Sequence, residues 1–160
     1  MAERINPLQS ASAAVRRATV DDAPAIESLY RELVSDLHIR VLPEQVATLA
    51  DSASSFLLVA EADGVVCATA LLTLCPDVMY RTQPFGVLEN IIVTQAVRGR
   101  GYGRLLLANI ERLASAHHCT KLMLLSSTAR EAAHVFFRRC GFASDTKQAF
   151  VKYRRQFTAL

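Results

Sequence analysis

Residues 88–107, with the sequence LENIIVTQAVRGRGYGRLLL, form the most informative stretch of this chain. It begins as a β-rich apolar run, passes through alternating arginine and glycine at residues 98–103, and continues with leucines at helical spacing. Glycines let a backbone adopt unusual dihedral angles and come close to a ligand. The first N–H groups of a helix have no partner within it and lie at the positive end of its dipole. The strand–loop–helix therefore predicts an anion site where a diphosphate accepts backbone hydrogen bonds.

Spacing separates this loop from two common phosphate-binding loops. A dinucleotide fingerprint needs glycine at its first, third and sixth positions, but Gly99 and Gly101 are followed by Arg104 at the sixth. A Walker loop ends in Gly-Lys-Ser or Gly-Lys-Thr, and the sequence contains neither triplet. Arg98, Arg100 and Arg104 add positive charge to the loop. A glycine-rich turn with solvated arginines remains the structural alternative.

On both sides of this stretch, the spacing of the apolar residues alternates between helical spacing and β-rich runs. This alternation predicts one α/β (α+β) domain over residues 15–160, with an antiparallel front half and a β-α-β-α-β back half. Helices are expected at residues 22–36, shortly after Pro43, and at residues 103–116 and 130–139. Strands are expected at residues 15–18, 55–61, 65–74, 86–94, 121–126 and 148–154. Ala62-Asp63-Gly64 should form a hairpin turn.

Composition excludes several classes of protein. Of 160 residues, 51% are hydrophobic and 21% are charged, which is typical of a globular domain. A net charge of +3 without a concentrated basic face argues against nucleic-acid binding. The longest apolar run, near residues 65–75, is too short to span a membrane. Residues 1–14 read as a flexible tail without a signal peptide.

Cysteine spacing provides a further expectation about compartment. The four cysteines match neither a zinc motif nor a redox pair: Cys67, Cys75, Cys119 and Cys140. We expect reduced thiols, no metal site and a cytoplasmic location.

Three motifs in the right order resemble the GNAT superfamily of N-acetyltransferases. Arg98, Gly101 and Gly103 match its loop signature of Gln or Arg, two residues, Gly, one residue, and Gly or Ala. Residues 88–93 resemble the family's fourth strand, and residues 133–142 resemble its last-helix signature. The likeness covers residues 15–155. It extends in part to small-molecule enzymes such as glucosamine-phosphate N-acetyltransferases, although residues 126–130 differ from the acidic stretch and asparagine of those enzymes.

The resemblance implies a mixed sheet of six to seven strands, about four flanking helices, and central strands that splay to admit acetyl-coenzyme A. The pantetheine arm would pair with the fourth strand, and the diphosphate would occupy the loop. The coenzyme-binding residues that it implies are Ile91, Ile92, Val93, Arg98, Gly99, Arg100, Gly101, Tyr102, Gly103, Arg104, Arg130 and Phe137.

The same resemblance implies a catalytic role for Glu89, which matches the glutamate in the family's fourth strand. Glu89 is the candidate general base, acting through water; the alternatives are that it orients the substrate ammonium or faces solvent. Substrate contacts are expected at Tyr30, Tyr80 and Asn90. Phe137 stands where the family has a tyrosine that serves the leaving thiolate, and phenylalanine has no donor.

The resemblance implies transfer of an acetyl group from acetyl-coenzyme A to a primary amine of a small molecule, by direct attack in a ternary complex. Two alternatives stay open: acetylation of a protein N-terminus or lysine, and a regulatory module that binds acyl-coenzyme A without catalysis. By analogy with the family, a homodimer is also expected.

Overall fold

The computed structural model describes residues 13–158. Most of the expected tail, residues 1–12, lies outside this range, and the first strand begins at Ala13, two residues before its expected start. The chain divides into two compact units, one ending at Leu124 and one beginning at Leu125. Each unit is described separately below.

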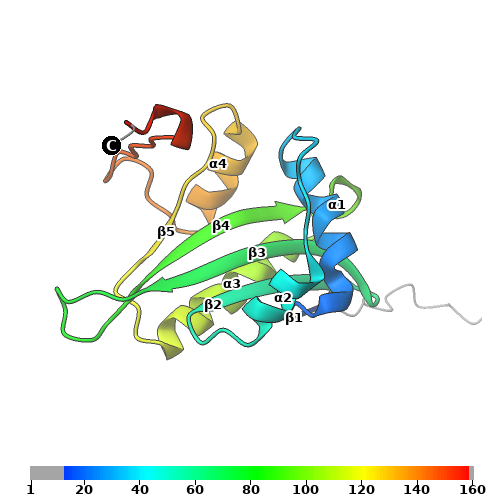
Figure 1. Cartoon of the computed structure of the whole chain (residues 1–160), viewed down its shortest axis with the longest axis horizontal. Helices are drawn as coiled ribbons and strands as arrows, with labels where there is room; N and C mark the ends of the chain where they lie inside the picture. Colours follow the sequence, from blue (N-terminus) through cyan, green and yellow to red (C-terminus); the bar gives the residue numbers. More distant parts are fainter. Residues whose placement is uncertain (1–12, 159–160) are drawn as a thin grey trace, which may run out of the picture. The chain divides into compact units, whose positions relative to one another are not determined.

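The first unit contains the sheet and three helices (Figure 1). Its elements are β1 (Ala13–Arg17), α1 (Ala23–Leu33), α2 (Pro43–Ala50), β2 (Ser55–Ala62), β3 (Val65–Cys75), β4 (Phe85–Val93), α3 (Tyr102–Ala116) and β5 (Leu122–Leu124). The second unit contains α4 (Glu131–Arg139) and a 3₁₀ turn at Arg154–Gln156. These elements confirm the α+β class and the four expected helices.

The strands follow one another across the sheet in the order β1-β2-β3-β4-β5. The first four are antiparallel neighbours, and β5 runs parallel to β4. The β2–β3 hairpin turns at Asp63 and Gly64, whose φ angles of 51° and 78° suit the tight turn expected there. At the start of β4, a Cβ on Gly86 would lie 2.5 Å from Leu122 Cδ2. The absence of a side chain at Gly86 therefore permits the close β4–β5 pairing.

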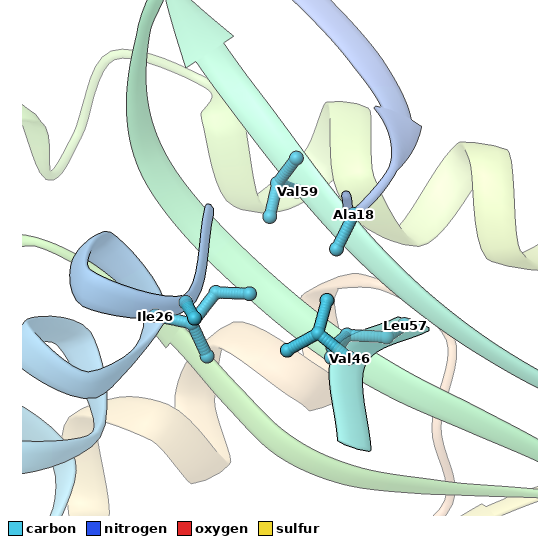
Figure 2. Close-up of a cluster of buried hydrophobic side chains, with 6 residues drawn as sticks. Ala18, Ile26, Val46, Leu57 and Val59 are labelled. Carbon is cyan, nitrogen blue, oxygen red and sulfur yellow. The ribbon is translucent and has the colours of Figure 1, made fainter. Parts of the chain in front are cut away.

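Helices α1 and α2 cover one face of the sheet. Figure 2 shows Ile26 of α1 and Val46 of α2 pointing toward Leu57 and Val59 of β2. Ile26 and Val59 are fully inaccessible to solvent, and burying a side chain of this size stabilises a fold by about 1.5–3 kcal/mol. Helix α3 lies against the opposite face (Figure 1). Strands β2 and β3 are therefore central and apolar on both faces.

Helix α1 is shorter at its C-terminal end than the expected range of 22–36. Val34 is already extended, with φ −137° and ψ 137°. Just beyond it, Asp36 Oδ1 accepts a 2.8 Å hydrogen bond from the His38 amide. Such side-chain-to-backbone bonds favour turns over helix, so the local chemistry of Asp36 outweighs the apolar periodicity.

The expected count of six to seven strands is wrong for residues 13–158, which contain five. The missing strand is the one expected at residues 148–154. A strand needs a neighbour to satisfy its backbone groups, and no residue from 148 to 153 pairs in a sheet. Phe150 and Tyr153 are 87% and 61% exposed, and the chain then turns where the Tyr153 amide donates to Gln156 Oε1.

Candidate functional site

A β-bulge in β4 determines the geometry of the candidate site. Leu71 of β3 faces Glu89, whereas Thr69 faces Ile92, so two β4 residues lie opposite Ala70. One of these is Asn90, whose φ of 55° is left-handed. Asparagine tolerates this conformation better than most residues do. A bulge redirects the strand beyond it.

The bulge changes which backbone groups face the open side of β4. The Thr94 amide donates a 2.9 Å hydrogen bond to Cys67 on the β3 side. Backbone groups alternate along a strand, so those of Ile92 also face β3, and those of Ile91 and Val93 face away from it. On that side, β5 pairs only with residues 86–88. Among the described residues, β4 therefore continues beyond its last pair with β5. The backbone groups of Ile91 and Val93 point to the side of β4 that has no paired strand there.

This edge leads directly into the arginine–glycine loop. Gly99 and Gly101 have φ angles of 78° and 93°, and within residues 13–158 no atom beyond their chain neighbours lies within 4 Å of the space that a Cβ would fill on either. Gly101 is the N-cap of the 15-residue helix α3. Helix geometry leaves the amides of residues 102–104 without an acceptor inside the helix. The loop therefore has the backbone freedom and the donors that a diphosphate requires.

The loop arginines have different roles. Arg98 Nε donates a 2.9 Å hydrogen bond to the Val93 carbonyl, which ties the loop to the end of β4. Arg100 and Arg104 are exposed and carry charge at the mouth of the loop. The Tyr102 side chain is 7% exposed and anchors the first turn of α3 in the core. The loop therefore combines positive charge with free backbone donors, which is the chemistry that an anionic ligand requires.

The structure brings Tyr30 and Asn90 together on the face of the sheet that α1 covers. Burial raises the pKa of the Tyr30 hydroxyl above its ordinary value, and the neighbouring Asn90 and Thr69 side chains offset part of this rise. Leu71 packs on the cluster beneath α1. Because directly opposed residues share a face, its partner Glu89 lies on that face too, and Glu89 is exposed.

Three other expected site residues belong to other segments of the chain. Tyr80 belongs to the loop between β3 and β4, at the end of β4 opposite α1 (Figure 1), and is 55% exposed. Arg130 and Phe137 belong to the second unit, where Arg130 is the N-cap of α4. Phe137 is 7% exposed there and packs on the rings of Phe136 and Phe142.

Two polar residues at the site carried no sequence signal that we identified. Thr69 is a buried hydroxyl in an apolar strand. Glu32 lies on the helix α1 and accepts hydrogen bonds from residues just before the loop. Thr69 bonds to Leu58 on the neighbouring strand, and Glu32 bonds to Thr94 and Gln95. These contacts join segments that are separated in sequence, so only the folded structure reveals them.

Two absences characterise residues 13–158. No group of three or more histidine, cysteine, aspartate or glutamate side chains is arranged to hold a metal ion there. Within the same range, every helix is too short or too polar to cross a membrane.

Comparison with known proteins agrees with this geometry. The family model described as "Acetyltransferase (GNAT) family" matches residues 25–142. Aminoglycoside N(6′)-acetyltransferase type 1 of Stenotrophomonas maltophilia is 31% identical over 140 residues, which cover 86% of this chain and 91% of that protein.

Solved structures share the fold. One match is a protein from Agrobacterium tumefaciens strain C58 that has been named as an acetyltransferase. Its TM-score is 0.79 and its sequence identity 29%, and the match covers 88% of this chain and 99% of that one. Aminoglycoside N-acetyltransferase AAC(6′)-Iy, solved in complex with CoA, matches with a TM-score of 0.77 and 19% identity, covering 94% and 99%. A glucosamine-6-phosphate N-acetyltransferase from Arabidopsis thaliana matches with a TM-score of 0.74 and 19% identity, covering 89% and 99%. With the family model matching most of its length, this chain belongs to the GNAT family of N-acetyltransferases.

Proposed function

We propose that this protein transfers the acetyl group of acetyl-coenzyme A to a primary amine of a small molecule, by direct attack within a ternary complex. The observation that carries the proposal is the continuity of the open β4 edge with the loop at the start of α3. Together they offer one run of backbone donors, from Ile91 through Val93 to the amides of residues 102–104. Such a run suits a long ligand that ends in a diphosphate.

Acetyl-coenzyme A supplies an activated acyl group, and the residues around it have three tasks. The outward N–H of Ile91 is suited to donate to the carbonyl oxygen as negative charge grows on it. Two bound reactants held in line need no enzyme nucleophile. Removal of the proton from the attacking ammonium is assigned to Glu89, through water, because its exposed carboxylate lies on the α1 face of the same strand.

For the acceptor, amino sugars of the aminoglycoside type are the first class to test. The relative that is 31% identical along most of this chain carries that activity in its name. Tyr30 and Asn90 offer polar contacts beside the bulge, and the segment between α1 and α2 borders the same helix. Glu89 adds a negative charge, which favours a cationic amine.

One observation favours a second candidate, which is binding of acyl-coenzyme A without catalysis. Phe137 offers no proton donor at the position where the family resemblance expects a tyrosine. In the leading proposal, the thiolate takes its proton from solvent.

Release of free thiol separates the two candidates. The purified protein is incubated with acetyl-coenzyme A and a panel of small amines that includes aminoglycosides and amino sugars. We expect thiol release that depends on at least one amine. Tight coenzyme binding with no thiol release across the panel would support the non-catalytic candidate instead.

A further inference from the structure

A cavity of about 590 Å³ is lined by the last turn of α1 and by the segment at residues 34–42 that connects α1 to α2. Its volume is within the range of pockets that bind small molecules. The lining consists of two arginines, one aspartate, one serine and two apolar side chains: Arg31, Arg40, Asp36, Ser35, Val34 and Leu37. The charged groups among these residues decide which kind of ligand the cavity suits.

Glu27 brings the two arginines of the cavity together. Its Oε1 accepts a 2.5 Å hydrogen bond from Arg31 Nη2 and lies 3.8 Å from Arg40 Nη1. Its Oε2 accepts a 2.9 Å hydrogen bond from the Val41 amide, which fixes the end of the connecting segment against α1. That amide is the main reason why the pKa of Glu27 lies below its ordinary value. A single charged carboxylate thus holds two guanidinium groups that would otherwise repel each other.

Both guanidinium groups keep donors that the protein does not use. The Arg31 side chain hydrogen-bonds through Nη2, and Arg40 Nη1 donates a 2.9 Å hydrogen bond to the Ile39 carbonyl. Neither side chain makes another hydrogen bond to any residue from 13 to 158. Nε and Nη1 of Arg31, together with Nε and Nη2 of Arg40, therefore remain for a ligand.

The acidic groups nearby do not cancel this excess of donors. Asp36 Oδ1 accepts the His38 amide at 2.8 Å and contacts His38 Nδ1 at 3.0 Å, so this carboxylate is occupied in shaping its own turn. Glu27 lines a second cavity of about 360 Å³, which Arg31 shares. The lining of the larger cavity has two positive charges and one negative charge. Guanidinium groups match the geometry of carboxylates and phosphates, so this cavity favours an anion.

The cavity lies at the end of α1 that adjoins the proposed coenzyme site. Glu32, the residue after Arg31, hydrogen-bonds Thr94 and Gln95, where β4 ends and the arginine–glycine loop approaches. Figure 1 shows the tip of β4 beside α1. Glu89 is exposed on the α1 face of the same strand, and its negative charge favours an ammonium group. A small molecule whose amine lies at β4 therefore has the arginine cavity beside it.

We propose that this cavity binds a carboxylate or phosphate group of the acceptor, so that the preferred acceptors are amines that also carry an anionic group. The inference rests on the proposed function, because it concerns the acceptor of the same reaction. Arg31 and Arg40 contact the anion, and Glu27 is a positioning residue that holds them. Purely cationic amines such as kanamycin A are then poorer acceptors than amines that carry an anion.

Binding of the anion can be measured without acetyl transfer. The ¹⁵N-labelled full chain is mixed with excess coenzyme A, which occupies the loop at residues 98–103, and is titrated with O-phosphoethanolamine, β-alanine or ethanolamine. We expect saturable shifts of the Arg31 and Arg40 Nε–H signals in NMR spectra with the two anionic amines and none with ethanolamine. The lower Kd shows whether phosphate or carboxylate fits better. Signals of both arginines that ignore both anionic amines would overturn the proposal.

Arg40→Gln removes one of the two guanidinium groups and should raise the Kd for the preferred anionic amine about tenfold. The matched control is Arg112→Gln, which removes an exposed guanidinium on α3. Equal Kd values for the two variants would contradict the role of Arg40.

Kinetics compare two matched pairs of amines: O-phosphoethanolamine with ethanolamine, and β-alanine with 3-amino-1-propanol. We expect kcat/KM for the anionic member of at least one pair to exceed that of the neutral member about tenfold. Arg40→Gln should remove most of this preference, whereas Arg112→Gln should keep it. Equal kcat/KM values within both pairs would overturn the assignment of the anion to the acceptor.

Failure of the anion site and failure of the proposed function give different results. Acetylation of amines without shifts at Arg31 and Arg40 would overturn the anion site and leave the proposed function in place. Shifts at both arginines, with no amine of the panel acetylated, would confirm the anion site and overturn the proposed function.

Discussion

The carboxylate of Glu32 accepts a 2.8 Å hydrogen bond from the hydroxyl of Thr94, and its second oxygen accepts the Gln95 amide at 3.1 Å. Glu32 lies in the last turn of α1, whereas Thr94 directly follows β4. Gln95 begins the 3₁₀ turn that leads into the arginine–glycine loop. One side chain of the acceptor-side helix thus fixes where the proposed coenzyme loop begins.

Replacing Glu32 by glutamine should therefore weaken coenzyme binding without a direct contact to the ligand. Glutamine has one acceptor oxygen instead of two and carries no charge, so both hydrogen bonds lose their charge assistance and one donor loses its acceptor. We expect the Kd for acetyl-coenzyme A to rise about three- to tenfold, as for loss of a charge-assisted hydrogen bond. Calorimetry measures this change. Glu111→Gln, at an exposed position on α3, is the control, and equal affinities of the two variants would contradict the role of Glu32.

Substitution of Gly101 can be compared with substitution of Gly64, because a side chain strains the backbone in a similar way at both positions. Gly101 and Gly64 both have positive φ angles and open space at the Cβ position. We expect Gly101→Val and Gly64→Val each to lower the free energy of unfolding, by about 1–2 kcal/mol. Only Gly101→Val should weaken coenzyme binding, on the order of tenfold or more, because it alters the start of α3. Denaturation and calorimetry together check this, and a similar loss of affinity in both variants would point to general destabilisation.

Comparison of sequence and structure shows what local patterns reveal. The hairpin at Asp63-Gly64 and the helix after the arginine–glycine loop depend on neighbouring residues, and both were predictable, although the helix begins at Tyr102, one residue before its expected start at Gly103. The bulge at Asn90 depends on its register with β3, 20 residues away along the chain, which periodicity cannot report. The alternating residues around Phe150 read as a strand because a sequence does not say whether a partner strand is available.

The ion pairs of Arg16 predict how stability depends on pH. Arg16 Nη1 lies 2.7 Å from Asp22 Oδ2, and Arg16 Nη2 lies 2.6 Å from Glu61 Oε1. The hydrogen bond from Arg16 is the main reason why the pKa of Asp22 is below its ordinary value of 3.8. A carboxyl group with a lowered folded pKa stabilises the fold above its unfolded pKa, and this contribution is lost as the pH falls through the folded pKa.

We therefore expect the free energy of unfolding to decline as the pH falls below about 4, and to decline less in Asp22→Asn. At neutral pH, Asp22→Asn should lower the free energy of unfolding by about 1 kcal/mol, because Arg16 is 37% exposed and solvent screens the ion pair. Urea denaturation at a series of pH values measures both effects. Asp21→Asn, an exposed neighbour, serves as the control. Identical pH profiles for Asp22→Asn and the wild type would contradict the assignment.

Glu89→Gln tests the proposed general base. The substitution keeps the size of the side chain and removes its ability to take a proton. We expect kcat to fall about 10²–10⁴-fold, with a changed pH profile of kcat/KM and little change in the affinity for acetyl-coenzyme A. Steady-state kinetics over a range of pH provide the measurement. A variant with unchanged kcat would leave Glu89 as an exposed strand residue without a part in proton transfer.

The central claim is that the β4 edge and the loop at residues 98–103 hold acetyl-coenzyme A for transfer to a small-molecule amine. Mass spectrometry of the acceptor, after incubation of the protein with acetyl-coenzyme A and kanamycin A or another amine of the panel, tests this claim most directly. We predict that at least one amine gains the mass of a single acetyl group, and that the Gly101→Val variant forms much less of this product. A wild-type protein that leaves every amine of the panel unmodified would contradict the account.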